Sequence, residues 1–303
     1  MNCTFYNQLI QMIDKKSVLL DEPMYKHTTF RVGGKADYFV MPHSVEEVQN
    51  LIALCRREKM PYYIMGNGSN LLVSDKGYRG LIIQIYKEMN AIVVQGDKIV
   101  AQAGALLSKV GNVALDAELT GFEFAAGIPG TVGGAVVMNA GAYGGEMKDI
   151  LLSATIVTQE GEVKVLSIDQ LELGYRTSII GKENYVVLEA RYQLEKGNKE
   201  AIRAKMDQLK TQRTTKQPLE YPSAGSTFKR PEGYFAGKLI QDAGLKGFQV
   251  GGAQVSEKHC GFVINTGEAT AADIANLIEQ VSEKVMQTFG VKLETEVKFL
   301  GEF

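Results

Sequence analysis

The sequence predicts an α+β fold, because short β-type runs and amphipathic helical segments both recur along its 303 residues. Residues 154–157 and 163–165 are apolar runs on either side of a Glu-Gly pair, a pattern typical of an antiparallel hairpin. Behind Thr270, apolar residues recur at helical spacing from Ile274 to Val285 and form one stripe. Hydrophobic residues make up 45% and charged residues 22% of the chain, which indicates a folded globular protein.

The remaining elements follow from the same two periodicities. Ser44 is followed three residues later by Glu47, the signature of a helix amino terminus, and this helix separates the strand-like segments 36–40 and 62–65. Residues 36–65 therefore form a strand–helix–strand unit. We expect helices at 4–13, 45–55, 106–119, 199–214, 235–243 and from Thr270 onward. We expect strands at 36–40, 62–65, 71–73, 81–83, 91–94, 98–100, 154–157, 163–165, 185–194, 262–264 and 291–299.

Charge and composition exclude several classes of function. Lys and Arg number 33 against 35 Asp and Glu, so the net charge of -2 gives no general attraction to nucleic acid or to an anionic membrane. No window approaches the ~18 consecutive apolar residues that span a bilayer, and polar residues interrupt any signal-like amino terminus. Three separated cysteines and three scattered histidines indicate neither a disulfide framework nor a His-rich metal site. We expect a cytoplasmic protein without bound metal and without an obligate protein partner.

The 32 glycines gather in clusters, and a cluster needs a reason such as positive φ or close approach of the backbone to a ligand. The first cluster is the loop 66–70, Gly-Asn-Gly-Ser-Asn, between two apolar β-type runs. Its backbone N–H groups can form a nest for phosphate oxygens. It lacks the third glycine of the dinucleotide fingerprint and the Gly-Lys-Ser/Thr of a P-loop. Taken alone, it is more simply an ordinary turn between strands.

The second cluster, residues 127–134, is a stronger signal. Gly130 and Thr131 suit the start of a helix, whose free N–H groups and dipole favour an anion. Gly133 and Gly134 remove side chains from its first turn, so that a ligand or another backbone can approach closely. A glycine-rich packing hinge is the alternative, although so many small residues weaken a helix without other cause. Two such loops predict a pyrophosphate clamped from two sides.

Basic residues between Arg213 and Arg230 lie in and before an irregular stretch that contains Ser226. Such side chains can converge on phosphates or on a carboxylate, and Arg can bind two oxygens at once. A solvated basic surface is the plainer interpretation. Ser226 has no His–Asp relay near it in the sequence, which disfavours a nucleophilic hydrolase. Arg176, in the short polar segment 175–178, is by default a surface residue.

Two pairs of neighbouring residues near the carboxyl end invite chemical interpretation. Glu294 and Glu296 lie two apart on the predicted closing strand and should therefore share a face. We expect Glu294 to be the solvated member of this pair. His259 next to Cys260 has no second ligand pair, so we expect either a structural histidine or a peripheral contact.

Six of these segments, in the same order, resemble UDP-N-acetylenolpyruvoylglucosamine reductases, the flavoproteins that make UDP-N-acetylmuramate for bacterial peptidoglycan. The resemblance runs from residue 28 to 299. The matching segments are Thr29-Phe30-Arg31-Val32-Gly33-Gly34, Gly66-Asn67-Gly68-Ser69-Asn70, Ala126-Gly127-Ile128-Pro129-Gly130-Thr131-Val132-Gly133-Gly134, Tyr175-Arg176-Thr177-Ser178, Ala224-Gly225-Ser226-Thr227-Phe228-Lys229 and Leu293-Glu294-Thr295-Glu296-Val297.

The resemblance implies an FAD-binding fold of the vanillyl-alcohol-oxidase type in two subdomains, residues 1–79 and 80–198, followed by an α+β substrate-binding domain, residues 199–303. It implies non-covalent FAD, NADPH as reductant, and reduction of UDP-N-acetylglucosamine enolpyruvate in a cytoplasmic step that serves cell-wall biogenesis, cell shape and cell division. Hydride from reduced FAD would reach the enolpyruvyl β-carbon, and a proton from Ser226 the α-carbon.

The same resemblance implies roles for individual residues. Arg176, Ser226 and Glu296 match catalytic positions: Arg176 would stabilise the negative charge that develops on the substrate, and Glu296 would orient or polarise the same group. Cofactor contacts would come from Asn67, Gly68, Ser69, Asn70, Ile128, Pro129, Gly130, Thr131, Gly133, Gly134, Asn139, Ala140, Gly141 and Arg213. Substrate contacts would come from Tyr175, Lys216 and Arg230.

Two positions depart from the pattern of the family. Arg230 stands where some members carry Asn, which fits a shorter subclass without an inserted substrate-capping loop, and the stretch between residues 176 and 213 is too short to supply that loop. Cys260 stands where a small Ala is usual, and we expect no chemical role for it.

Two other functions are compatible with the glycine loops. A member of the same flavin fold could carry covalently attached FAD, but no His or Cys lies within 66–70 or 126–134 to form the tether. A non-catalytic nucleotide-binding protein could use the loops for phosphate alone, and Arg176, Ser226 and Glu296 would then be incidental.

Overall fold

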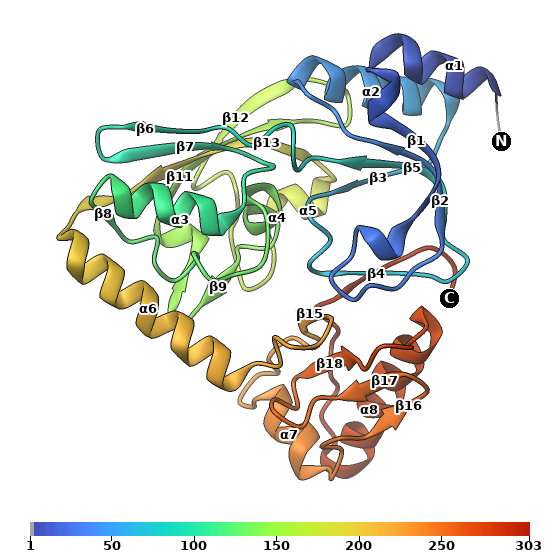
Figure 1. Cartoon of the computed structure of the whole chain (residues 1–303), viewed down its shortest axis with the longest axis vertical. Helices are drawn as coiled ribbons and strands as arrows, with labels where there is room; N and C mark the ends of the chain where they lie inside the picture. Colours follow the sequence, from blue (N-terminus) through green and yellow to red (C-terminus); the bar gives the residue numbers. More distant parts are fainter. Residues whose placement is uncertain (1–2) are drawn as a thin grey trace. The chain divides into compact units, whose positions relative to one another are not determined.

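The computed structural model of the protein describes residues 3–303 (Figure 1). Its contacts divide the chain into two compact units, each made of separate stretches of sequence. Unit 1 contains Met1–Leu20, Tyr38–Asn67 and Gly80–Gln212, and unit 2 contains Asp21–Asp37, Gly68–Arg79 and Arg213–Phe303. This grouping is coarser than the three consecutive domains expected from the sequence, which stay a prediction.

Unit 1 contains a five-stranded antiparallel sheet with the order β12-β11-β13-β7-β6. Its strands are β6 (Ile92–Gln95), β7 (Lys98–Gln102), β11 (Leu151–Val157), β12 (Val163–Ser167) and β13 (Val186–Gln193). The predicted hairpin is confirmed, because β11 and β12 pair with Thr155 opposite Val165. The central strand β13 is mostly buried at its apolar residues, Val186, Val187, Leu188, Ala190 and Tyr192.

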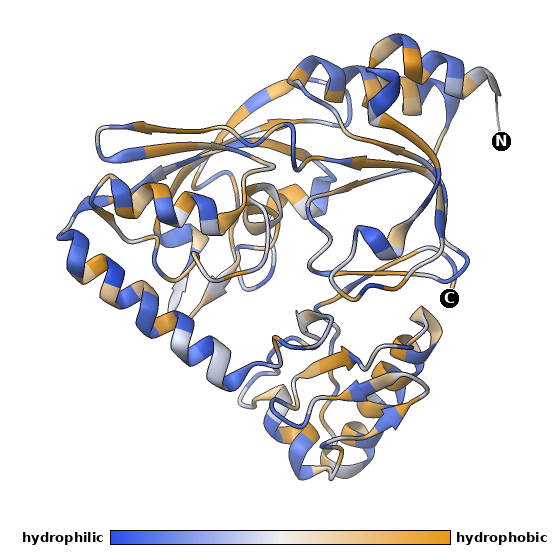
Figure 2. Ribbon diagram, in the orientation of Figure 1, coloured by the Kyte–Doolittle hydropathy of each residue, from blue (hydrophilic) through white to orange (hydrophobic). Residues whose placement is uncertain are grey.

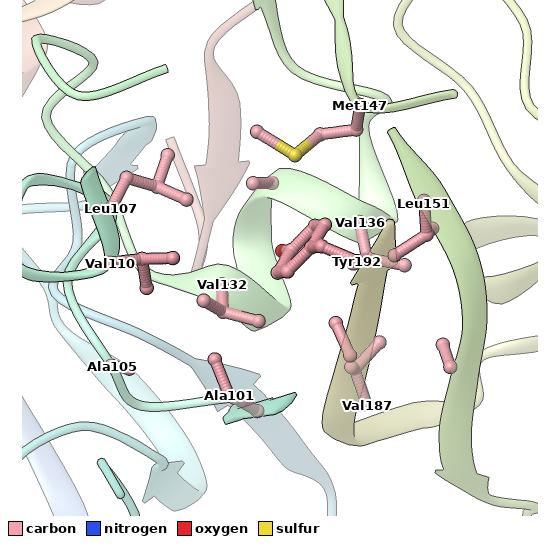
Figure 3. Close-up of a cluster of buried hydrophobic side chains, with 14 of the residues drawn as sticks. Ala101, Ala105, Leu107, Val110, Val132, Val136, Met147, Leu151, Val187 and Tyr192 are labelled. Atoms are coloured by element: carbon pink, nitrogen blue, oxygen red, sulfur yellow. The ribbon is translucent and has the colours of Figure 1, made fainter. Parts of the chain in front are cut away.

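The largest apolar core of unit 1 packs on this sheet. It includes residues of α3 (Leu107–Asp116) and of the short helix α4 (Val132–Val137). Figure 3 shows Val132 and Val136 of α4 in the same cluster as Tyr192 of β13, whose side chain is fully buried. The glycine-rich segment that begins α4 is therefore held against the sheet by the apolar side chains of the helix itself.

A second sheet has the strand order β1-β2-β5-β3. Within it, β3 (Tyr62–Met65) runs parallel to β5 (Tyr78–Gln84). The helix α2 (Val45–Glu58) connects β2 (Lys35–Val40) to β3, so the predicted strand–helix–strand unit is confirmed. The other strand is β1 (Val18–Pro23).

The amino terminus of α2 departs in one detail from the predicted capping box. The hydroxyl of Ser44 accepts the N–H of Glu47 at 3.1 Å, as expected. The carboxylate of Glu47 accepts the backbone N–H of His43 at 2.6 Å. The chain is therefore fixed one residue before the cap.

The first helix, α1 (Cys3–Met12), packs against α2 through a separate apolar cluster that includes Phe5 and Leu51. Figure 2 shows hydrophobic and hydrophilic residues alternating around α1, as an amphipathic helix requires. The longer α6 (Lys199–Lys216) is mostly hydrophilic in the same view, and Ile202 and Leu209 are its buried residues. The shorter elements are η1 (Lys15–Ser17), η2 (Met24–Lys26), β8 (Leu119–Thr120), β9 (Gly141–Ala142), β10 (Gly145–Glu146), η3 (Met147–Asp149), α5 (Ile179–Glu183) and β14 (Glu195–Lys196).

Unit 2 contains an antiparallel sheet of order β15-β18-β17-β16. The strands are β15 (Ser223–Ser226), β16 (Gln249–Val250), β17 (Ala253–Val255) and β18 (Phe262–Asn265), and the helices are α7 (Ala236–Asp242) and α8 (Ala271–Phe289). The predicted stripe of α8 is buried from Ile274 to Val285 and contacts this sheet.

The predicted closing strand is the element that differs most from expectation. Only Lys298–Leu300 forms a strand, β19, which runs parallel to β4 (Leu71–Val73). Residues 291–297 are irregular apart from a single bridge between Thr295 and Phe228. As a result, Glu294 is exposed and Glu296 is buried, so the expectation that they share a face is wrong. The expectation that Glu294 is the solvated member is confirmed.

The amino terminus of α8 supports a prediction about acid stability. Hydrogen bonds from the backbone of Thr270 and, secondarily, from Gly252 and the Thr270 hydroxyl lower the pKa of Asp273. This carboxylate therefore stabilises the folded state fully above its unfolded pKa of about 3.9, and the contribution is lost as the pH falls through the lower folded value.

Replacing Asp273 with alanine is expected to lower the free energy of unfolding by about 0.5–1 kcal/mol at pH 7. Urea unfolding followed by circular dichroism should show that this difference shrinks at pH 3. The exposed Glu279 in the same helix provides the control Glu279→Ala, which should change the free energy little. A difference for Asp273→Ala that stays constant on acidification contradicts the capping role.

Candidate functional site

Gly66, the first residue of the first glycine cluster, meets the second cluster within unit 1. A Cβ added to Gly66 would lie 2.3 Å from the Oγ1 of Thr131, so only glycine allows this approach. Gly134, one turn into α4, has the opposite surroundings, because an added Cβ would meet only the same Oγ1, at 3.7 Å. The hydroxyl of Thr131 is therefore the common neighbour of a tightly packed glycine and of a glycine with open space beside it.

The amino terminus of α4 differs from the predicted anion site. Thr131 is the N-cap, as expected, but the N–H of Val132 donates to Ala105 O at 2.9 Å and that of Gly133 to Ala103 O at 2.8 Å. Gly133 also packs against Ala103, with 3.0 Å from an added Cβ to that side chain. These two amides therefore already donate to protein carbonyls. Gly133 has a packing role, as in the alternative interpretation of a glycine-rich packing hinge. Gly134 is the glycine of this pair that has open space beside it.

Asn139 is fully buried and has a φ of +44°. Its amide donates to the carboxylate of Glu146 at 2.7 Å and to Gly174 O at 3.1 Å, while its Oδ1 accepts the N–H of Lys148 at 2.9 Å. The side chain thus connects the turn after α4 with the segment that carries Arg176. Of the predicted contacts Asn139, Ala140 and Gly141, the Asn139 side chain is already occupied by the protein.

Tyr175 and Arg176 form the tip of a tight turn. Gly174 and Thr177 exchange backbone hydrogen bonds at 3.1 and 3.3 Å, which closes the turn. Arg176 has a φ of +55°, a conformation that costs a non-glycine residue about 1 kcal/mol or more. Its Nη2 donates to Gly141 O at 3.3 Å, and its guanidinium lies 5.3 Å from the Tyr175 ring centroid. A residue that the sequence placed on the surface by default is therefore held in one strained, defined position.

Ser226 is exposed because the strand that carries it is bulged. Successive side chains of a strand alternate, so Ala224 and Ser226 would normally share a face. Instead Ala224 is buried and Ser226 is exposed, and the pairing of β15 with β18 shifts between Ser223 and Ser226. Gly225 has a φ of +78°, which a bulge of this kind requires. The Ala-Gly-Ser sequence thus places Ser226 on the exposed side of the strand.

Replacing Gly225 with alanine is expected to cost about 1 kcal/mol of stability, because an L-residue at this φ is strained. The space around it is open, since an added Cβ meets nothing within 4 Å. The cost is therefore due to the backbone alone. Thermal unfolding measures it, and Gly225→Asn should recover part of the loss because Asn tolerates this region. Equal destabilisation by Ala and Asn contradicts this account of the bulge.

Glu296 is held by its backbone beside the Ser226 strand. Its N–H donates to Thr227 O at 2.8 Å, and its carbonyl accepts from the amide of Asn70 at 3.1 Å. Thr227 is fully buried, and its hydroxyl accepts the N–H of Val263 at 3.0 Å. Glu296 as a whole residue is 9% exposed. Unit 2 therefore brings together Ser226, Glu296 and the last residue of the first glycine loop.

The other predicted contacts have different neighbours. Arg213 and Lys216 lie in the last turn of α6, where Arg213 donates to Gln217 at 3.5 Å. Arg230 stacks on the ring of Phe235, with 4.0 Å from its guanidinium carbon to the ring centroid.

In the loop 66–70, Gly68 has a φ of +68° and its carbonyl accepts the N–H of Thr29 at 3.2 Å. Asn67 and Ser69 are partly exposed within the same loop, as are Ile128 and Gly130 in the second loop, while Pro129 is exposed.

The surroundings of His259, Cys55 and Cys260 are typical of residues with a structural role. His259 accepts the N–H of Gly261 at 3.1 Å and packs edge-on against Phe262, and burial lowers the pKa of its ring. Burial raises the pKa of the Cys55 thiol to about 12 and also raises that of Cys260. Both thiols are therefore protonated and unreactive at neutral pH. In residues 3–303 no group of three His, Cys, Asp or Glu side chains is arranged to hold a metal ion.

Comparison with known proteins identifies the two parts of the sequence. Residues 36–167 match an FAD binding domain, and residues 217–300 match the C-terminal domain of UDP-N-acetylenolpyruvoylglucosamine reductase. The reductase of that name from Agathobacter rectalis is 54% identical over 315 residues, 100% of both chains. The one from Alkaliphilus oremlandii is 53% identical over 98% of both chains. The chain belongs to the UDP-N-acetylenolpyruvoylglucosamine reductase family. The resemblance stated from six sequence segments is thereby confirmed.

Solved structures agree with this assignment. The crystal structure of UDP-N-acetylenolpyruvylglucosamine reductase from Thermus caldophilus is similar, with a TM-score of 0.80 and 35% identity over 94% of this chain and 98% of that chain. The glucose dehydrogenase Phl p 4.0202 shares the fold alone, with a TM-score of 0.52 and 15% identity over 65% of this chain and 44% of that one. The predicted fold class, an FAD-binding fold followed by an α+β domain, is confirmed. None of the helices in residues 3–303 is long and apolar enough to cross a membrane.

The unit 1 residues fit the FAD that the family implies. The space beside Gly134 is open to a ligand, and Gly66, which has no side chain, lies against the Thr131 hydroxyl that borders this space. The sequence alone did not predict the hydrogen bonds by which the buried Asn139 side chain connects two segments. Nor did it predict the hydrogen bonds that hold the backbone of Glu296. It also missed the bulge at Gly225, although a glycine between Ala224 and Ser226 was the available signal.

Proposed function

We propose that this protein catalyses the NADPH-dependent reduction of UDP-N-acetylglucosamine enolpyruvate to UDP-N-acetylmuramate, a step of peptidoglycan precursor synthesis. The observation that carries the proposal is the pairing in unit 2 of an exposed Ser226 with Glu296, whose backbone is bonded to the residue after that serine. A protein that only bound a nucleotide would not need a bulge that exposes Ser226 on the strand to which the backbone of Glu296 is bonded.

The FAD is expected to be held without a covalent bond by Asn67, Gly68 and Ser69 of the first loop and by residues 128–131 and Gly134 of the second. Bound FAD supplies hydride transfer from NADPH to the substrate. We expect Gly134 to leave the room that the pyrophosphate needs and Thr131 to offer a hydroxyl next to it. Acid precipitation should release the flavin into the supernatant, whereas a covalent flavin would stay with the pellet.

The substrate is an enol ether with a carboxylate on its α-carbon. Addition of hydride to the β-carbon builds negative charge on the α-carbon and the carboxylate, and a fixed cation stabilises that charge. Arg176 suits this task, because its turn and its bond to Gly141 hold the guanidinium in one place before the substrate arrives. An Arg also matches the two oxygens of a carboxylate.

A proton must then reach the α-carbon to complete the reduction. Ser226 is proposed as the donor to this carbon, since it is exposed at the end of β15. A serine is a weak acid, and it can act only if it is held close to a strongly basic carbon. Glu296 is proposed to orient the carboxylate of the substrate. Tyr175, Lys216 and Arg230 are proposed to contact the rest of the sugar nucleotide, and Arg213 the flavin.

Two measurements test this function. The purified protein should show flavin absorbance that NADPH bleaches, and it should convert the enolpyruvyl nucleotide to UDP-N-acetylmuramate in a steady-state assay. We expect NADPH and the nucleotide to bind in turn, which gives parallel double-reciprocal lines. Intersecting lines would contradict alternate binding, and a protein without flavin that forms no product would refute the function itself.

A further inference from the structure

Asn70 ends the first glycine loop, and its side chain connects that loop to Glu296. Its Nδ2 donates to the Glu296 carbonyl at 3.1 Å, and its own backbone carbonyl accepts the N–H of Lys298 at 3.0 Å. One residue therefore binds the chain on both sides of Val297. The family resemblance implies only a cofactor contact for Asn70.

This arrangement follows from the register of two short strands. β4 begins at Leu71, directly after Asn70, and β19 begins at Lys298, two residues after Glu296. The strands run parallel, with Leu71 opposite Lys298. Parallel strands have their amino ends at the same edge, so the loop that enters β4 and the segment that enters β19 must lie next to each other. The pairing brings Asn70 to Glu296.

The backbone of Glu296 is thereby fixed at both of its polar groups. Thr227 accepts the N–H and Asn70 donates to the carbonyl, while Thr227 itself is anchored through Gly261 O at 2.9 Å and Val263 N at 3.0 Å. Residues 291–297 form no regular strand. In such a segment these few hydrogen bonds determine where the Cα of Glu296 lies, and the Cα determines where a buried carboxyl group can point.

We propose that Asn70 is a positioning residue for Glu296, so that the loop predicted to bind the cofactor also sets the geometry of a catalytic carboxyl group. The inference rests on the proposed function for its kinetic consequence and on the hydrogen bonds of unit 2 for its structural one. A displacement of about 1 Å in a reacting group costs on the order of 10²-fold in rate.

The test uses Asn70→Asp, which keeps the size of the side chain but places an acceptor against the Glu296 carbonyl. The matched control is Asn90→Asp, because the Asn90 amide also donates to a backbone carbonyl, that of Lys87, in a turn outside the candidate site. Each flavin-loaded variant is reduced with NADPH and then mixed with the enolpyruvyl nucleotide. We expect Asn70→Asp to slow re-oxidation by about 10- to 100-fold, a much larger effect than any change in its flavin content or in its reduction by NADPH. Asn90→Asp should change all three quantities by less than about twofold.

A double-mutant cycle distinguishes action through Glu296 from a general structural effect. In the Glu296→Gln background the carboxyl group is already absent, so Asn70→Asp should slow re-oxidation by less than about threefold more. If the losses of re-oxidation rate in Asn70→Asp and in Glu296→Gln multiply in full in the double variant, the proposal is overturned. A loss of flavin content in Asn70→Asp equal to its loss of re-oxidation also overturns it, since Asn70 would then act on the cofactor.

Hydrogen exchange keeps the inference testable even if the proposed function fails. In Asn70→Ala the amides of residues 294–298 should exchange at least about tenfold faster than in the wild-type protein, because the Glu296 carbonyl loses its donor. Amide exchange in β18 and α8 should be unchanged. Unchanged exchange in 294–298 overturns the positioning role. A wild-type protein that is reduced by NADPH but not re-oxidised by the nucleotide refutes the proposed function and leaves the exchange result to decide on Asn70.

Discussion

Replacing Ser226 with alanine is expected to slow re-oxidation of the reduced protein by the enolpyruvyl nucleotide by about 10²- to 10⁴-fold, the range for loss of a positioned proton donor. Reduction by NADPH should stay nearly intact, because that half-reaction requires no proton on the substrate α-carbon. Rapid mixing, with flavin absorbance recorded separately for each half-reaction, measures both rates.

The neighbouring strand residue Ser223 provides the control. It lies on the same strand, β15, opposite Ile264, and has no proposed role in the reaction. Ser223→Ala should change neither rate by more than about twofold, within the range expected for a surface substitution. An equal loss of both half-reactions in Ser226→Ala would remove Ser226 from the proton-donor role, since a donor to substrate carbon cannot affect flavin reduction.

Replacing Gly134 with alanine is expected to change apoprotein stability and flavin affinity in opposite directions. Gly134 lies inside α4, and an added Cβ meets only the Thr131 hydroxyl, at 3.7 Å. The helix should therefore gain about 0.5–1 kcal/mol, the usual advantage of Ala over Gly. If the pyrophosphate occupies the open space, the same methyl group should weaken FAD binding by about 1–3 kcal/mol, or roughly 5- to 150-fold.

Gly181→Ala separates these two effects. Gly181 lies within α5, and an added Cβ meets only a methyl group of Val137, at 3.9 Å. This variant should gain similar stability and bind FAD normally. Thermal unfolding of the apoproteins and fluorescence titration with FAD give both quantities. Normal FAD affinity in Gly134→Ala would show that the cofactor does not use this space.

Much of the fold was predictable because its signals are local. The hairpin at 154–165, the helix capped by Ser44 and the amphipathic α8 each depend on periodicity or on a cap that lies within a few residues. The closing strand was overpredicted for the same reason. Residues 291–299 alternate in sequence, but only 298–300 find a partner strand, because β4 supplies just three residues. Pairing of distant segments decides such cases, and a single sequence does not show it.

The residues of the candidate site likewise divide into those that the sequence predicts and those that depend on contacts between distant segments. Gly66 and Gly134 were predictable, since a glycine cluster indicates either close approach of the backbone or room for a ligand. The occupation of the Gly133 amide by Ala103 was not, because it depends on how α4 packs against the sheet. The buried brace made by Asn139 and the clamp of Asn70 on Glu296 also escaped prediction, as each joins segments that are remote in sequence.

The most direct test is an anaerobic titration of the purified protein. NADPH should bleach the bound flavin, and one equivalent of UDP-N-acetylglucosamine enolpyruvate should then restore the oxidised spectrum and yield one equivalent of UDP-N-acetylmuramate. If the flavin stays reduced after the nucleotide is added, or re-oxidises without forming that product, the protein does not perform the proposed reduction.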